Sequence, residues 1–268
     1  MKNFKKFLLF VFSFFLTVFF SVYQRVTGPT HPFFAKLKVL EKEYKLKFPR
    51  SQNTGEDAKI VLPIDEKLIR AELYFKNISE DGDWERVEFK REGKELYATL
   101  KTLPPAGKYH YYVKIYYFER QVQIPDKPIS IRFKGKVPDL ILIIHILIIF
   151  TGFLLSIYTG LYTYFYEIKI KLILFTFILF FIGAGVLGPI VQYYAFGQFW
   201  TGFPWGKDLT DNKGLILIIF WGVAYFKARK GKGKLWVYIA FLFSILTFFI
   251  PHSMWGSELK GGKIKTGP

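Results

Sequence analysis

The sequence contains no cysteine and only two methionines among its 268 residues. The lack of cysteine excludes disulfides, thiol redox chemistry, thiolate metal sites and haem attached covalently through a Cys-x-x-Cys-His motif. Acidic residues are also scarce, with 21 against 38 basic ones, so the formal net charge is +17. No basic stripe lies on a recognisable nucleic-acid-binding module, and nucleic acid is therefore not an expected partner.

Apolar residues are abundant, since 51% of the chain is hydrophobic and 20% is aromatic. They come in uncharged runs rather than alternating with polar residues, which is typical of helices that cross lipid. The fourth run is short and crosses only if its helix begins near Thr210, with a threonine or an aspartate as its cap. The sequence predicts about five membrane-spanning helices, at residues 7–23, 140–166, 172–192, 215–226 and 235–250.

The first run follows a basic flank, and no small-residue cleavage site comes after it. Residues 1–26 are therefore expected to be a retained membrane anchor rather than a cleaved signal peptide. In either case the segment that follows is exported. In such a protein, the excess of basic residues reflects cytoplasmic loops and attraction to anionic headgroups, so membrane lipid is an expected partner.

Residues 27–137 change character and predict an extracytoplasmic β domain. Short segments alternate apolar with polar residues and are separated by turn formers such as Asp81-Gly-Asp83 and Pro104-Pro-Ala-Gly107. Six or seven short strands predict an all-β, immunoglobulin-like sandwich. His110 is expected to be structural, and Asp81 and Asp83 a solvated turn rather than a cation site. The expected strands are 69–75, 87–90, 96–100, 109–117, 121–124 and 129–133.

The short basic loops indicate how residues 138–268 are threaded as a four-helix transmembrane domain. With a cytoplasmic N-terminus, Lys169, Lys171 and the basic cluster 227–234 all lie inside, as the positive-inside rule requires. The β domain, the loop 193–213 and the tail from Pro251 then lie outside. We expect the protein in the inner (cytoplasmic) membrane.

One ionisable residue, His145, lies well inside a predicted span. Gly152, Ser156 and Gly160 follow it at intervals of seven, four and four, so His145 shares a face with a stripe of small residues. Such stripes are contact surfaces between helices in lipid. His145 is therefore expected to point into the bundle, either as a functional group or as a buried histidine bonded to a neighbouring carbonyl.

The outer loop 193–213 combines aromatic residues with glycines, in Phe196-Gly-Gln-Phe-Trp200 and Trp205-Gly-Lys-Asp208. Aromatic rings next to glycines form flat surfaces on which planar ligands stack. Aspartate and lysine side chains can order such a loop or pair with charged groups of a ligand. The alternative is an interfacial aromatic belt, but a belt does not explain the Gly-Phe-Pro-Trp-Gly-Lys-Asp segment, residues 202–208, between two spans. His252 follows the last span on the same side, and neutral imidazole is a standard axial ligand of haem iron.

These residues resemble the haem-handling membrane proteins of cytochrome c assembly, in particular their synthase branch, over about residues 140–255. That family carries a Trp-rich external loop flanked by two external histidines that ligate haem, and its last helix ends in His-Ser-Tyr. The resemblance implies haem ligation by His145 and His252. The residues that match the family's loop are Phe196, Gly197, Trp200, Trp205 and Asp208.

The departures from the family pattern concern the loop and the inner side. Phe196 stands at the first Trp of the pattern, and the spacing from Trp200 to Asp208 is longer. Lys227 stands near the place of the inner histidine of the transporting branch, so the resemblance does not extend to a haem conduit through the membrane. An anchor and a β domain replace the family's extra early spans.

Three hypotheses of function follow. In the first, non-covalent b-type haem at the outer face serves delivery or electron transfer, and the β domain docks an apocytochrome or a respiratory or assembly complex. In the second, the protein is a cofactor-free accessory or anchor subunit that uses its β domain for contacts. In the third, the protein is an enzyme acting on lipid or glycan, with Asp208, Asp211 or Glu258 as acid or base.

Overall fold

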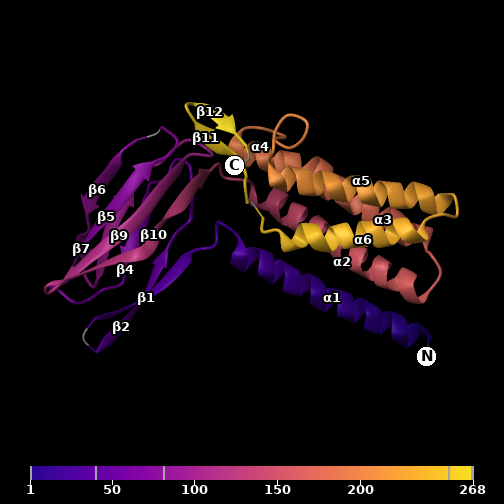
Figure 1. Cartoon of the computed structure of the whole chain (residues 1–268), viewed down its shortest axis with the longest axis horizontal. Helices are drawn as coiled ribbons and strands as arrows, with labels where there is room; N and C mark the ends of the chain where they lie inside the picture. The colour runs from indigo at the N-terminus through magenta and orange to yellow at the C-terminus, as the bar shows by residue number, and fades with distance from the viewer. Residues whose placement is uncertain (1, 40, 81, 253, 267–268) are drawn as a thin grey trace. The chain divides into compact units, whose positions relative to one another are not determined.

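The computed structural model describes residues 2–39, 41–80, 82–252 and 254–266. These residues fall into two compact units, one helical, within 1–29, 137–256 and 266–268, and one of strands, within 30–136 and 257–265 (Figure 1). Asp81 of the predicted turn and Ser253, which follows His252, lie outside the described residues.

The helical unit contains the predicted apolar helices. Within the described residues, four helices are long and apolar enough to cross a membrane, and α6, with 16 residues, is a shorter apolar helix. The third of the four combines α3, η1 and α4 in one continuous run, 170–196. The helices are α1 (Lys2–Thr27), α2 (Asp139–Phe165), α3 (Ile170–Phe180), η1 (Phe181–Leu187), α4 (Gly188–Phe196), α5 (Leu209–Arg229) and α6 (Lys234–Phe249).

Small residues set how closely these helices pack. A Cβ at Gly152 would lie 3.3 Å from Leu179 on α3, and one at Gly160 would lie 2.5 Å from the ring of Phe241 on α6. The predicted small-residue stripe of α2 is therefore a contact surface between helices. Helices α2, α3, α5 and α6 lie side by side and α1 packs on α2 and α6 (Figure 1). Their buried centre includes Trp221, whose Nε1 donates to Ser244 Oγ at 2.9 Å.

The helical run 170–196 contains a π-helical segment, η1, just before Pro189. Proline has no N–H and its ring clashes with the carbonyl one turn earlier, so a regular α-helix is disfavoured there. The backbone N–H of Gly188 instead bonds the carbonyl of Gly183, five residues earlier. π-Bulges of this kind occur frequently at functional sites.

The β unit holds two larger sheets and two hairpins. The five-stranded sheet has the order β3-β10-β9-β5-β6, with β3 parallel to β10, and the three-stranded sheet has the order β4-β8-β7. The hairpins are β1-β2 and β11-β12. The strands are β1 (Phe33–Val39), β2 (Lys42–Phe48), β3 (Ser51–Asn53), β4 (Ala58–Leu62), β5 (Arg70–Asn77), β6 (Trp84–Glu88), β7 (Lys90–Glu92), β8 (Glu95–Leu100), β9 (Lys108–Tyr117), β10 (Arg120–Lys134), β11 (Glu258–Lys260) and β12 (Lys263–Lys265).

The strands differ from the predicted set in three ways. The four strands before residue 69 were not predicted, and the expected strand 87–90 is divided between β6 and β7. The two expected segments 121–124 and 129–133 belong to one strand, β10, whose pairing with β9 shifts between Ile124 and Ile129. The irregularity includes Pro125 and Pro128, which interrupt the alternating pattern because proline cannot donate to the ladder.

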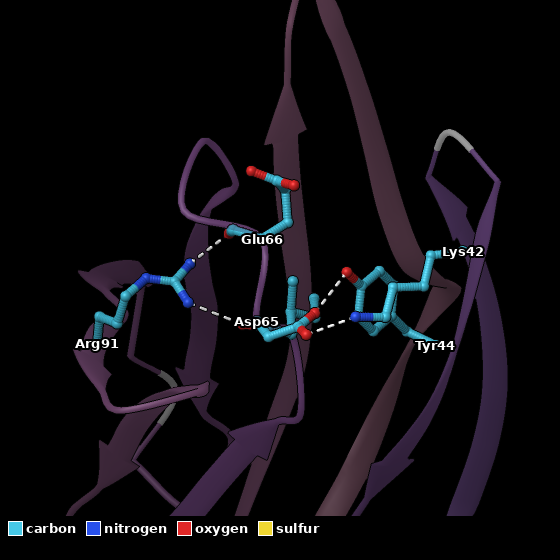
Figure 2. Close-up of polar contacts among 6 residues, drawn as sticks. Lys42, Tyr44, Asp65, Glu66 and Arg91 are labelled. Carbon is cyan, nitrogen blue, oxygen red and sulfur yellow. Dashed lines mark hydrogen bonds and ion pairs between the residues drawn. The ribbon is translucent and has the colours of Figure 1, made fainter.

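A polar network fastens hairpin β1-β2 to the segment between β4 and β5 (Figure 2). Asp65 accepts hydrogen bonds from Lys42 Nζ and, at 2.8 Å, from the Tyr44 hydroxyl, and these bonds lower its pKa. On the other side, Arg91 donates to the carbonyls of Ile64 and Glu66, both at 2.8 Å. The segment 63–69 is therefore held from two directions.

Hairpin β11-β12 belongs to the β unit, although the chain reaches it only after α6. The backbone N–H of Leu259 bonds the carbonyl of Ala106 at 3.0 Å, and Lys108 Nζ lies 3.4 Å from Glu258 Oε2. Burial, aided by the nearby charge of Arg132, lowers the pKa of Lys108 to about 8. The tail from Pro251 was expected only as an external segment, and no strand was predicted in it.

Candidate functional site

His145 lies in the second turn of α2 and bonds the π-helical segment η1. Its Nδ1 lies 3.1 Å from the carbonyl oxygen of Gly183, and because a carbonyl only accepts, Nδ1 carries the proton. A Cβ at Gly188 would lie 3.9 Å from His145 Cε1. The histidine is thus packed against the bulge that Pro189 accompanies, and its other ring nitrogen, Nε2, is the one that can accept or ligate.

The hydrogen bond from His145 to Gly183 is consistent with both interpretations of His145, as a structural residue and as a ligand. A structural histidine has the carbonyl partner that it needs. A ligand histidine ordinarily donates its second ring N–H to a carbonyl or a carboxylate, which fixes the tautomer and the ring orientation. The bond to Gly183 does this and leaves Nε2 unprotonated.

The aromatic loop begins where α4 ends. Phe196 is the last residue of α4, and Gly197 ends the helix with a φ of 77°, a left-handed conformation that glycine adopts without strain. Half-buried Trp200 donates its Nε1 proton to the carbonyl of Phe203 at 3.0 Å. Trp205 is 82% exposed. One tryptophan therefore folds the loop on itself, and the other presents its indole outward.

Asp208 is buried and caps α5. Its Oδ1 accepts the backbone N–H of Thr210 at 2.8 Å, and its Oδ2 lies 3.2 Å from the Thr201 hydroxyl. The expected aspartate cap near Thr210 is thus confirmed. With only 2% of its surface exposed, Asp208 orders the loop, which is the first of the two roles proposed for it from the sequence.

Asp211 binds the same loop from the first turn of α5. Its Oδ2 accepts the backbone N–H of Thr201 at 2.6 Å and lies 3.2 Å from the Thr201 hydroxyl. Gln192 of α4 also donates to that hydroxyl, so the loop is tied to both neighbouring helices. The partial positive charge at the N-terminus of α5 favours the two carboxylates, which lie in its first turn and at its cap.

Two glycines allow this loop to close on α5. A Cβ at Gly202 would lie 2.7 Å from Asp211 Cβ, and one at Gly206 would lie 2.2 Å from the carbonyl oxygen of Thr201. Such distances leave no room for a side chain at either position. The loop is further held by Lys207, whose backbone N–H donates to Thr266 Oγ1 at 2.8 Å.

Lys213 was treated as an ordinary loop residue in the sequence, but it is a buried residue of α5. Its Nζ donates to the carbonyl oxygen of Ile250 at 2.9 Å and is 3.5 Å from that of Pro251. These carbonyls end α6, where a cation is favoured by the helix dipole. The apolar run 215–226 is shorter than a helix that could cross a membrane. Helix α5 reaches that length by including the polar residues before the run, Asp211 and Lys213, with Asp208 as its cap.

His252 lies directly beyond α6 and its side chain is exposed. Its carbonyl oxygen would be 3.7 Å from a Cβ at Gly28, so this backbone passes the end of α1. Within the part of the chain that the structure describes, no three His, Asp or Glu side chains are grouped to hold a metal ion. Glu258, the third carboxylate of the enzyme hypothesis, belongs to the β unit, where it pairs with Lys108.

Comparison with known proteins identifies no relative of this chain. No protein-family model, no curated protein and no solved structure matches the chain. The similarity to the haem-handling proteins of cytochrome c assembly therefore rests on the sequence motifs alone.

Proposed function

We propose that the chain is a membrane haem-binding protein related to cytochrome c assembly, with His145 as an axial ligand. The observation that carries this proposal is the 3.1 Å bond from His145 Nδ1 to the Gly183 carbonyl. It orients the ring and leaves Nε2 as the free ligand atom, as in ligand histidines with a carbonyl behind them. The position of the bond at a π-bulge is further support.

The residues of the outer loop fit this proposal to different degrees. Exposed Trp205 and half-buried Trp200 offer indole faces to a planar ligand, and Phe196 and Gly197 set where the loop leaves α4. Asp208 acts indirectly, since both of its oxygens have partners within the protein. His252 is exposed and would supply the second axial imidazole.

Haem held in this way is b-type and supplies one-electron chemistry or serves as cargo for delivery. The protein's part is to present imidazole nitrogens, to stack aromatic rings and to exclude water. The short-loop lysines support an orientation with a cytoplasmic N-terminus in the inner membrane.

The β unit is proposed to be an extracytoplasmic immunoglobulin-like sandwich that docks an apocytochrome or a respiratory or assembly complex. The strand orders support this, because β10-β9-β5-β6 and β4-β8-β7 follow the G-F-C-C′ and B-E-D orders of such domains.

The second candidate is a cofactor-free accessory subunit. The observation in its favour is that the loop is already held by bonds of Thr201 to Asp211 and of Lys207 to Thr266. A loop ordered in this way is a rigid contact surface without any ligand, and exposed Trp205 would then be a protein contact.

The test is an oxidised and reduced absorption spectrum of the detergent-purified protein, as isolated and after haem is supplied. His145→Gln keeps an amide donor for the Gly183 carbonyl but cannot replace imidazole on iron, so the Soret band should fall sharply while the fold persists. His252→Ala should weaken the band as well. His31→Ala and His110→Ala, which change the other two histidines, are the matched controls and should leave the spectrum unchanged.

Free imidazole separates ligation from structure. It should restore the spectrum of a His145→Gly variant if the ring is a ligand. A wild type that stays colourless with haem supplied, or a Soret band indifferent to His145→Gln, would overturn the proposal in favour of the accessory subunit.

A further inference from the structure

Hairpin β1-β2 has two chemically different faces. The residues that alternate onto its inner side, Leu37, Val39, Tyr44, Leu46 and Phe48, are buried in the core of the β unit. The residues on its outer side are exposed and mostly basic. We call this outer side the lysine face, and it consists of Phe34, Lys36, Lys38, Glu43, Lys45 and Lys47.

The strand register concentrates like charges on this face. Lys36 lies directly opposite Lys45, and Phe34 lies opposite Lys47. Like charges directly opposite each other destabilise a hairpin, so the arrangement opposes local stability. Features that oppose local stability occur characteristically at functional sites.

The charge of the face is only slightly neutralised within the protein. Lys36 Nζ lies 2.9 Å from Glu43, the single acidic residue of the face. Lys38, Lys45 and Lys47 make no ion pair with any residue that the structure describes. Three lysines without an ion pair therefore face solvent together, although Lys38 lies opposite Glu43 in the register.

The support beneath the face is rigid. Tyr44 donates to Asp65 at 2.8 Å and Lys42 pairs with the same carboxylate, while Arg91 holds the segment around Asp65 from the other side (Figure 2). Lysines held on a rigid hairpin lose less conformational entropy on binding than lysines on a flexible basic tail, because they are already close together.

We propose that the lysine face binds anionic lipid headgroups of the membrane in which α1 is anchored. The chain keeps the two within reach, since six residue steps from Thr27, the end of α1, to Phe33 span at most about 22 Å. Phe34, 59% exposed, is the member of the face nearest to the anchor along the chain, and an apolar ring beside lysines suits the boundary between headgroups and acyl chains. Basic clusters next to a membrane helix attract anionic lipids in this way.

The lack of cysteine makes a site-specific test straightforward. A Phe34→Cys variant of the full chain, labelled with bimane so that one apolar ring replaces another, is placed in nanodiscs of phosphatidylcholine with or without about one-third phosphatidylglycerol. Quenching by acrylamide, which is uncharged, reports how far the label is shielded from water. A Lys94→Cys label in the exposed turn between β7 and β8 is the control.

We expect the quenching constant of the Phe34→Cys label to fall about threefold in the anionic nanodiscs and to recover at high salt, because the attraction is screened. Adding Lys45→Ala and Lys47→Ala, which removes two of the lysines without an ion pair, should abolish the fall, whereas Lys67→Ala and Lys94→Ala, also exposed, should not. The Lys94→Cys label should respond equally in both lipids.

Equal quenching of the Phe34→Cys label in both lipids would overturn the proposal, as would shielding that survives loss of Lys45 and Lys47. Shielding found only in native membranes, and in no purified lipid, would also overturn it and identify an acidic protein as the occupant.

Discussion

The backbone N–H of Thr201 donates a 2.6 Å hydrogen bond to Oδ2 of Asp211. This bond joins the aromatic loop to the first turn of α5, and both residues are buried. Because a buried amide without a partner is costly, the conformation of the loop depends on this carboxylate.

Asp211→Ala should release the loop. The change leaves the Thr201 N–H without its partner and should lower the free energy of unfolding by about 2–3 kcal/mol. Asp211→Asn keeps an oxygen acceptor and should have a smaller effect. Limited proteolysis between residues 198 and 207 measures the release, with Asp139→Asn, an exposed aspartate in the first turn of α2, as control.

Gly206→Ala should open the same loop by a steric route. The new Cβ would lie 2.2 Å from the Thr201 carbonyl oxygen, which is backbone and cannot move aside cheaply. Faster proteolysis of the loop in Gly206→Ala is expected, with Gly82→Ala, where the nearest atom is 3.4 Å away, unaffected. If the Gly206→Ala loop resisted proteolysis as well as the wild-type loop, the close approach of Gly206 to the Thr201 carbonyl would be contradicted.

Gly160→Ala should weaken the contact of α2 with α6. Its Cβ would lie 2.5 Å from Phe241 Cγ, and overpacking of this kind costs about 1–3 kcal/mol. A smaller partner should restore part of the loss, so Gly160→Ala with Phe241→Leu should be more stable than the sum of the two single changes. Thermal unfolding in detergent of the four proteins measures this coupling, and strict additivity would contradict it.

Lys108→Met should remove a pH dependence from the β unit. Lys108 has a pKa of about 8 in the folded protein against 10.5 when exposed, chiefly because of burial. Between pH 8 and 10.5 the unfolded chain keeps a proton that the folded protein lacks, so stability should rise with pH across this window.

The expected rise is at most about 3 kcal/mol. Subtracting the profile of the Lys108→Met variant cancels the other groups that titrate there. Lys108→Met should be at least as stable as the wild type at pH 7, because Glu258 keeps Lys260 at 3.8 Å. Parallel profiles from pH 7 to 10.5, measured by circular dichroism of the full chain, would count against a buried, charged Lys108.

Local patterns in the sequence were sufficient to locate the long apolar helices. Each signal involves residues of a single helix, so periodicity and capping rules could identify it. The signals are the uncharged runs, the aspartate at the start of α5 and the stripe from Gly152 to Gly160. Strands β5, β8 and β9 were found for the same reason, since each buries one face and alternates.

Contacts between distant residues were decided only by the tertiary structure. The partner of His145 is a carbonyl 38 residues away, in the π-helical segment that precedes Pro189. Hairpin β11-β12 joins a domain that the chain left more than a hundred residues earlier. Lys213 looks like a polar loop residue in the sequence, because the carbonyl that accepts its hydrogen bond belongs to Ile250, at the end of another helix.

The sequence by itself determined which segments are apolar enough for lipid and where most helices begin, because these depend on neighbours along the chain. The tertiary structure decided which polar groups are buried together, such as Thr201 with Asp208 and Asp211. The physical reason is that burying a polar group is tolerated only where a partner lies within hydrogen-bonding distance, and that distance is set by packing rather than by sequence separation.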